Sequence, residues 1–456
     1  MFAGVPVGST GYMSLVVAGA VEGALAKLAM VCATAPPQQA VALVQGCVIS
    51  KLDYTRRTVH AAVGDAQYLR FDDMVVQWLE RAMGARGWVN VVKVKQQLFL
   101  PSSSGGLSFR AMEGAAEAAV LASHAAAYKF WGSSMPVPAT FDLQVQRFNV
   151  QRVSVAGRVS VDFVTLMEQL CALPKPQKYL AGLVRKRKEE LFLSGLAPEQ
   201  LEQVAAMRDP GSALYLLSTD YGSVLPVHPY RKPFSTSEEY QYLFKRALVG
   251  LPNPHNLDPA RVLICGRHFI SSGALCTEPV NLRLAHVETR CQGVRGQRKH
   301  TAVQNAVVTV ARSVGLSAVS SGYILGATAH GDITLSGFQP LSMVVDVKNI
   351  NIKGVNVVAR KAAKETENER LYKAPCAQAG LDFSSFVTTV WGGFGASAIE
   401  LLKVMAQRLV ERENVSNSWA MMSIRRRIQS AFMKQIAING LTFVRKIRAQ
   451  MGAGQL

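Results

Sequence analysis

The spacing of apolar residues changes along this chain, and that change constrains the fold more than any other feature of the sequence. Over the first 250 residues apolar side chains recur at helical spacing, as from Tyr12 to Met30 and from Phe71 to Met83. Short β-branched runs come later, at Asp332–Leu335, Met343–Val347 and Phe383–Val390. The order helix, strand, strand, helix, strand, helix predicts a compact α/β domain. The expected fold class is therefore α+β and multi-domain.

The charge of the chain is strongly positive. Its 456 residues include 50 Lys and Arg against 31 Asp and Glu, which gives a net charge of +19. Hydrophobic residues make up 49% of the chain, so it can bury sizeable cores and is not broadly disordered. A basic protein of this kind favours a polyanionic partner, with DNA or RNA as the first candidate and an anionic membrane surface as the second.

The cysteines and the N-terminal apolar stretch indicate where in the cell the protein is expected. Seven cysteines, an odd number in a long chain, do not indicate a disulfide framework, so a reducing intracellular environment is expected, and for a nucleic-acid-binding protein the nucleus. The stretch from Met13 to Ala35 is interrupted by Glu22 and Lys27 and lacks a basic leader. We therefore predict neither a signal peptide nor a membrane span.

Two helix starts can be predicted from local chemistry. Asp72 and Asp73 resemble the paired aspartates of a polymerase, but they open an amphipathic pattern, so we interpret them as first-turn carboxylates of a helix. A second helix is expected over Ser235–Leu251, with Ser235 or Ser237 as its N-cap. Neither site predicts catalysis.

A cluster of thiols and imidazoles indicates a possible structural zinc site. Cys265, Cys276, His286 and Cys291 lie within about twenty-five residues, and these side chains are the ligands that tetrahedral Zn²⁺ takes. His268 is a competing ligand. The gap between the first two cysteines is longer than usual, so the alternative is a set of buried free cysteines that bind nothing.

Two aspartates and a lysine form the second chemical candidate. Asp332 begins one strand-like run, while Asp346 and Lys348 lie two residues apart in the next, so the latter two side chains point to the same side. Two carboxylates at one edge of a sheet can hold Mg²⁺, and a nearby lysine can assist the activation of water. This is the Asp…Asp-x-Lys arrangement of metal-dependent nucleases. The alternative is ordinary solvent-facing charge at strand ends.

Basic residues concentrate in two helical regions. The middle region contains Arg185, Lys186, Arg187 and Lys188, and the last forty residues contain Arg425, Arg426 and Arg427. These residues are candidates for contacts to nucleic-acid phosphates. The alternative for both regions is a solvated helix face.

Several segments together resemble one family, the non-LTR retrotransposon reverse transcriptase proteins that carry a C-terminal restriction-like endonuclease. The resemblance covers most of the chain in the same order, from the helical thumb that follows the polymerase palm to the end of the nuclease. The segments that carry it are Val5–Ser9, Gln45–Val59, Phe71-Asp72, Leu100–Ser123, Ser235–Pro252, Arg298-Lys299-His300, Asp332 with Asp346, and Phe383–Gly395 with its Gly392-Gly393-Phe394-Gly395 turn.

The resemblance implies a division of the chain. It predicts a thumb-like helical region at 1–130, a helical linker region at 131–254 and a zinc-knuckle-like segment at 255–297. A restriction-endonuclease-like domain of the PD-(D/E)XK type would occupy 298–412, and basic C-terminal helices 413–456.

The resemblance also implies an activity, Mg²⁺-dependent nicking of DNA. Asp332 and Asp346 would hold the metal, Lys348 would position or activate the attacking water, and Glu365 or Glu367 would complete the site. The knuckle would bind zinc and, with Arg298, Lys299 and His300, grip duplex phosphates.

Departures from the family pattern leave alternatives open. The palm and fingers have no counterpart, so polymerase activity is not implied, and a truncated or decayed copy of a transposable element is expected. Gly331 stands where the family has proline, Leu263 where it has the first knuckle cysteine, and Asn368 where it often has lysine. Lys348, Lys364 and Lys373 are the available substitutes. The alternatives are a catalytically dead nucleic-acid-binding remnant and a partly folded, non-functional product.

Overall fold

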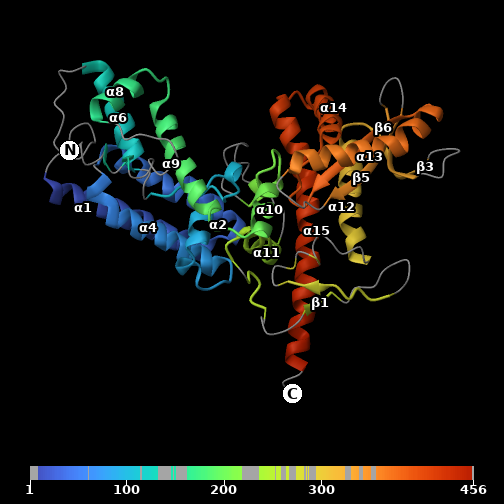
Figure 1. The fold of residues 1–456 in the computed structure, drawn as a ribbon, viewed down its shortest axis with the longest axis horizontal. Helices are drawn as coiled ribbons and strands as arrows, with labels where there is room; N and C mark the ends of the chain where they lie inside the picture. Colours follow the sequence, from blue (N-terminus) through green and yellow to red (C-terminus); the bar gives the residue numbers. More distant parts are fainter. Residues whose placement is uncertain are drawn as a thin grey trace. The chain divides into compact units, whose positions relative to one another are not determined.

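The structure is a computed structural model that divides into two compact units. Unit 1 comprises Met1–Pro101 and Gly106–Leu196, and unit 2 comprises Ser102–Gly105 and Ala197–Leu456. The boundary near residue 196 lies inside the segment predicted as a helical linker. Helices and two small sheets together confirm the α+β class (Figure 1). The residues described are 9–59, 61–112, 116–131, 145–146, 148–149, 162–217, 236–251, 253–257, 263–265, 274–281, 284, 286, 294–323, 330–337, 342–350 and 356–453.

The described part of unit 1 is helical. A π-helical turn at Val44–Val48 and a 3₁₀ turn at Ile49–Leu52 follow α2. The helices of this unit are α1 (Thr10–Thr34), α2 (Pro37–Leu43), α3 (Asp53–Thr58), α4 (Ala61–Ala82), α5 (Val92–Leu98), α6 (Ala116–Trp131), α8 (Phe163–Cys171) and α9 (Pro176–Leu193).

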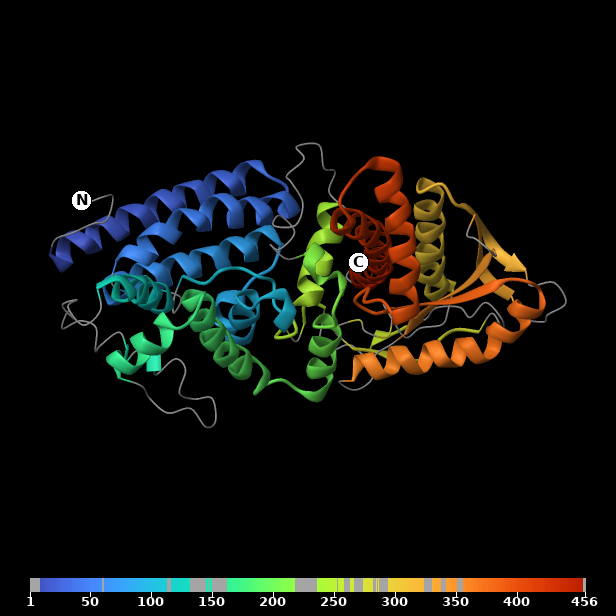
Figure 2. The ribbon, with the colours of Figure 1, turned by 90° about the horizontal axis from the view of Figure 1, so that it is seen from above.

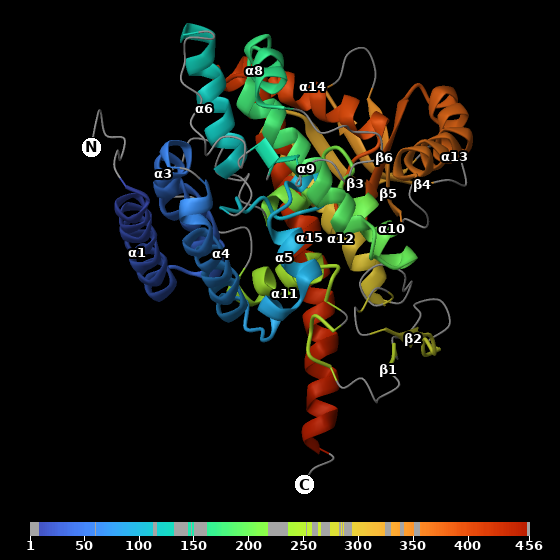
Figure 3. The same cartoon turned by 60° about the vertical axis from the view of Figure 1, so that its left-hand side comes forward.

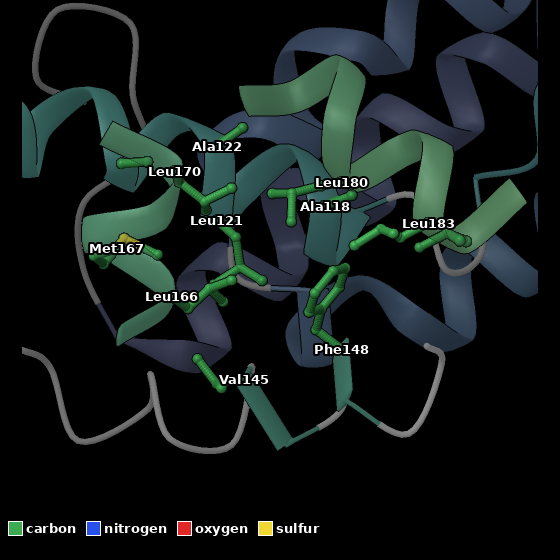
Figure 4. Packing of buried hydrophobic residues seen from close by; sticks show 12 residues of the cluster. Ala118, Leu121, Ala122, Val145, Phe148, Leu166, Met167, Leu170, Leu180 and Leu183 are labelled. Carbon is green, nitrogen blue, oxygen red and sulfur yellow. The ribbon is translucent and has the colours of Figure 1, made fainter. Parts of the chain in front are cut away.

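One apolar core of unit 1 lies between α6, α8 and α9. Leu121, Leu166 and Leu180 are completely buried there, as is Phe148 from the short segment before α8. Figure 4 shows these side chains pointing into the space between the three helices. Burying a leucine or phenylalanine contributes about 1.5–3 kcal/mol, so this cluster fixes α9 and with it the basic residues on its surface.

Helix α1 exposes part of its apolar surface. Its inner face is buried at Val17, Val21 and Ala24, whereas the side chains of Leu15 and Met30 are exposed. Among the described helices, α1 alone is long and apolar enough to cross a membrane by length and composition, and 28% of its most apolar window is buried. The prediction that the chain has no membrane span stays a prediction.

The interpretation of Asp72 and Asp73 as first-turn carboxylates is wrong. Helix α4 begins at Ala61, eleven residues before Asp72, so both aspartates lie in its middle. Asp72 is buried, and both its carboxylate oxygens accept the Met112 N–H at 2.9 Å. Asp73 instead pairs with Lys95. Their role is to anchor the loop before α6 and helix α5 to α4.

Unit 2 begins with two short helices, α10 (Pro198–Met207) and α11 (Ser237–Ala247). The N-cap of α11 is Thr236, which lies between the two serines expected for that role. The Glu239 N–H donates to the Thr236 hydroxyl, and the Glu239 carboxylate accepts the Thr236 N–H at 2.8 Å. These two hydrogen bonds form a capping box, in which a Glu or Gln three positions after the cap residue bonds back to it.

A four-stranded mixed sheet forms the centre of the α/β domain. Its strands are β3 (Ser317–Tyr323), β4 (His330–Ser336), β5 (Met343–Ile350) and β6 (Asp382–Thr389), in that spatial order. The first three are antiparallel neighbours, and β5 and β6 run parallel. The parallel pair needs a crossover connection, which α13 (Val357–Gln378) supplies.

Helices cover both faces of this sheet. In Figure 2, α13 lies on one side of it, and α12 (Val294–Ser313) lies on the other. On the α13 side, Val344 packs with Cys376, Tyr372 and Phe383. Helices α14 (Ala396–Glu413) and α15 (Asn417–Ala453) complete the domain, so the predicted basic C-terminal helices are one helix of 37 residues that packs on α12 and α14.

Candidate active site

Strands β4 and β5 bring Asp332 and Asp346 together. In their antiparallel register Ile333 pairs with Val345 and Thr334 with Val344, so Asp332 and Asp346 are opposite each other one step beyond the Ile333–Val345 pair. Directly opposite side chains point to the same face with Cβ atoms about 4.5–5.5 Å apart. The structure therefore places the two predicted carboxylates side by side, although thirteen residues separate them in the sequence.

Asp346 is a buried carboxylate with one partner cation. Its side chain is 1% exposed, and its Oδ1 lies 3.1 Å from the Lys348 Nζ. The other oxygen, Oδ2, is buried and accepts no hydrogen bond from the described residues. A buried oxygen without a donor costs about 1–3 kcal/mol, and more when it is charged. A cation at this oxygen would remove that cost.

Asp332 is held from two directions. Its Oδ2 lies 2.9 Å from the His300 Nε2 of α12 and accepts the Val347 N–H of β5 at 2.7 Å. Gln304, one turn further along α12, donates to the Asp332 backbone carbonyl. Three groups from two elements thus fix the orientation of this carboxylate before any ligand binds.

The environments of the two aspartates separate their pKa values. Burial raises the pKa of Asp346 to about 6; the Asp332 charge adds to the increase, and Lys348 opposes it. Burial also acts to raise the pKa of Asp332, but the hydrogen bonds from His300 and Val347 outweigh it and hold that pKa below its ordinary value. The site therefore carries one firmly ionised carboxylate and one whose charge the protein compensates only in part.

Two basic side chains, Lys348 and His300, contact the acidic pair. Burial acts to lower the pKa of Lys348, but the neighbouring Asp346 outweighs this effect and raises it. The hydrogen bond to Asp332 raises the pKa of His300. Lysine and histidine thus lie on opposite sides of the acidic pair, Lys348 on Asp346 and His300 on Asp332.

Glu365 and Glu367, which were expected to complete the site, have other partners. The Glu365 carboxylate accepts the Ser397 N–H at 2.9 Å and so caps α14, while Glu367 pairs with Lys364 at 2.8 Å on the surface. Asn368, buried next to the sheet, donates from its Nδ2 to the Ser385 Oγ at 2.8 Å. Lys373 is exposed.

The zinc candidates converge around a two-stranded sheet. Strand β1 (Leu263–Ile264) pairs antiparallel with β2 (Pro279–Val280), as Figure 3 shows, and the Cys265 N–H donates to the Glu278 carbonyl. The ligand atoms of Cys265, Cys276 and His286 lie within 4.8 Å of one another, with the Cys276 Sγ 3.3 Å from the His286 Nε2.

This spacing fits a tetrahedral metal. Zn–S bonds of about 2.3 Å and Zn–N bonds of about 2.0 Å put ligand atoms about 3.5–3.8 Å apart. Cys276 therefore offers a thiol beside the ligand atoms of Cys265 and His286. The fourth predicted ligand, Cys291, and the competing His268 lie outside the described residues.

The predicted phosphate-binding residues differ in exposure. Arg185 and Lys186 are exposed on α9, with Arg187 and Lys188 half-buried beside them. On α12, Arg298 is exposed, but Lys299 is buried and His300 contacts Asp332. On α15, Arg425 lies over the Phe394 ring and Arg427 donates to the Ser313 hydroxyl at 2.7 Å. The roles of these residues in nucleic-acid binding stay predictions.

Comparisons with known proteins assign no family. No protein-family model matches the chain, and no curated protein matches it.

Proposed function

We propose that the protein is a Mg²⁺-dependent DNA-nicking endonuclease that uses Asp332, Asp346 and Lys348, with helical and zinc-binding segments that hold nucleic acid. The observation that carries this proposal is the buried Oδ2 of Asp346, which has no hydrogen-bond donor among the described residues and lies beside a second carboxylate. A fold gains no stability from such a pair, because desolvation and mutual repulsion both oppose it. A divalent cation compensates both effects.

The chain's own residues supply the rest of the reaction. Bound Mg²⁺ would lower the pKa of a coordinated water and stabilise negative charge on a phosphate. Lys348, 3.1 Å from the Asp346 Oδ1, would position the attacking water and donate to a phosphate oxygen. His300 and the Val347 N–H hold Asp332 in place, which reduces the cost of ordering the site when substrate binds.

The resemblance to endonuclease-bearing retrotransposon proteins supports DNA as the substrate. Contacts to DNA phosphates that do not depend on base sequence would come from the net charge of +19 and from the exposed side chains of Arg185, Lys186 and Arg298. The three described donors at Cys265, Cys276 and His286 have the chemistry and spacing for Zn²⁺, which would organise a segment that has little core of its own.

The test is nicking of supercoiled plasmid DNA by the full chain in Mg²⁺, with Asp346→Ala compared at matched DNA occupancy. Asp382→Asn is the control, because Asp382 is an exposed carboxylate at the start of β6, away from the acidic pair. We expect nicking by the wild type and the control, and none by Asp346→Ala. Salt-sensitive DNA binding without nicking by any of the three would support the alternative, a catalytically dead nucleic-acid-binding remnant.

A further inference from the structure

Helix α13 presents a polar stripe to the rest of the domain. Lys361, Glu365 and Asn368, spaced by four and three residues, are all buried, which is unusual for these residue types. Lys361 donates to both Asp209 oxygens, at 2.7 and 2.9 Å, and to the Phe394 carbonyl. Glu365 caps α14. The first two buried groups therefore have structural roles.

Asn368 is only half satisfied by its surroundings. Its side chain is 0% exposed, and its Nδ2 donates to the Ser385 Oγ. Its Oδ1 is buried and has no hydrogen-bond partner within the described chain. Most buried polar atoms have a partner, so an orphaned one calls for an explanation such as an ion or a water.

The register of the sheet places this amide beside the acidic pair. Ser385 on β6 is the parallel partner of Asp346 on β5, so the two side chains are neighbours. Tyr372, one turn after Asn368 on α13, has its pKa raised by burial and by the charges of Asp346 and Asp332. The stretch of α13 from Asn368 to Tyr372 therefore lies against the proposed metal site.

Asp346 Oδ2 and Asn368 Oδ1 are thus two buried oxygens that find no donor in the described part of the chain, and both residues neighbour Ser385. Oxygen atoms from carboxylates and amides are the ligands that Mg²⁺ and Mn²⁺ prefer. We propose that the Oδ1 of Asn368 is a third oxygen ligand of the cation held by Asp332 and Asp346, with Ser385 fixing the orientation of the amide. This inference rests on the proposed function.

Asn368 is a neutral residue beside the Lys348–Asp346 ion pair. A lysine at this buried position would add a cation next to Asp346, whereas an amide adds a neutral ligand. Lys348 already lies on the other oxygen of Asp346, so the chain retains one ammonium group at the site.

The experiment is calorimetric titration of the full chain with Mn²⁺, with no nucleic acid present. The variants are Asn368→Leu, which keeps the shape and removes the oxygen, and Asn368→Asp, which keeps the oxygen and adds charge. We expect Asn368→Leu to bind Mn²⁺ about tenfold more weakly, in line with the 10–100-fold losses typical of metal-site residues, and Asn368→Asp to bind at least as tightly as wild type.

The other outcomes would contradict either the ligand assignment or the proposed function. If Asn368→Leu binds Mn²⁺ as tightly as wild type does, or Asn368→Asp binds it more weakly than Asn368→Leu, the assignment of the Asn368 Oδ1 as a ligand is wrong. If wild type and Asp346→Asn both fail to bind Mn²⁺, the proposed function itself fails. Metal-free thermal unfolding of each variant establishes that the domain is folded.

Discussion

The burial of Asp346 predicts that the protein becomes more stable when this carboxylate is neutralised. The folded-state pKa of about 6 lies about 2.2 units above the ordinary value of 3.8. At about 1.36 kcal/mol per unit, the ionised carboxylate costs the metal-free fold about 3 kcal/mol above pH 6. Asp346→Asn removes this cost and leaves Lys348, which is 35% exposed and can be hydrated.

The sign of the pH dependence follows from the direction of the shift. Because the folded state binds this proton more tightly than the unfolded state, the native protein loses stability relative to the variant as pH rises from about 4 to 6. The expected difference is about 0.5 kcal/mol at pH 4 and about 3 kcal/mol at pH 8. Above pH 6 it stays constant.

Hydrogen exchange measures this difference within unit 2 and avoids a two-state analysis of the whole chain. In magnesium-free buffer at pH 8, backbone amides of β5 and β6 should exchange roughly 150-fold more slowly in Asp346→Asn than in wild type, and only two- to threefold more slowly at pH 4. Mg²⁺ should slow exchange in the wild type alone. A variant that exchanges faster at pH 8, or a difference independent of pH, would refute the reasoning.

Three further changes test other parts of the account. His300→Ala should raise the Mg²⁺ concentration needed for half-maximal nicking about tenfold. His300→Gln can still donate to Asp332, so its requirement for Mg²⁺ should be close to that of wild type. Equal effects of the two changes would exclude a positioning role for His300. Elemental analysis should find about one zinc ion per wild-type chain and less in Cys276→Ser. A folded wild-type protein without zinc would show that this group is not a zinc site. The double change Arg185→Gln and Lys186→Gln should make the plot of log DNA affinity against log salt concentration shallower, by the amount expected for about two phosphate contacts. An unchanged slope would show that other residues make these contacts.

The α/β domain was largely predictable because its signals are local. The strand patterns around Asp332 and Asp346 are β-branched and apolar, and both strands form where expected. Strand β3, with the sequence SAVSSGY, was not predicted, because serine and glycine carry little strand preference; its pairing with β4 stabilises it instead. The period of two residues likewise sufficed to place Asp346 and Lys348 on one face.

The surroundings of the site could not be predicted from spacing. His300 lies 32 residues from Asp332, and nothing local distinguishes a histidine that orients a carboxylate from one that contacts phosphate. Glu365 has the right residue type and region for a metal ligand, but the start of α14 takes its carboxylate. In the sequence, Asn368 stands out only because the resembled family often has lysine at this position. Its location at the site follows from the strand register, which places Ser385, its hydrogen-bond partner, beside Asp346.

The separate roles of metal and lysine offer the most direct test of the account. Lys348→Gln, measured at pH 8 where Asp346 is ionised, should reduce plasmid nicking at least 100-fold at matched DNA binding, because the group that acts on the water is gone. The same variant should bind Mn²⁺ as tightly as wild type or more tightly, since an ammonium that competes for the Asp346 carboxylate has been removed. Undiminished nicking by Lys348→Gln, or no nicking by wild type in Mg²⁺, would contradict the assignment of this site.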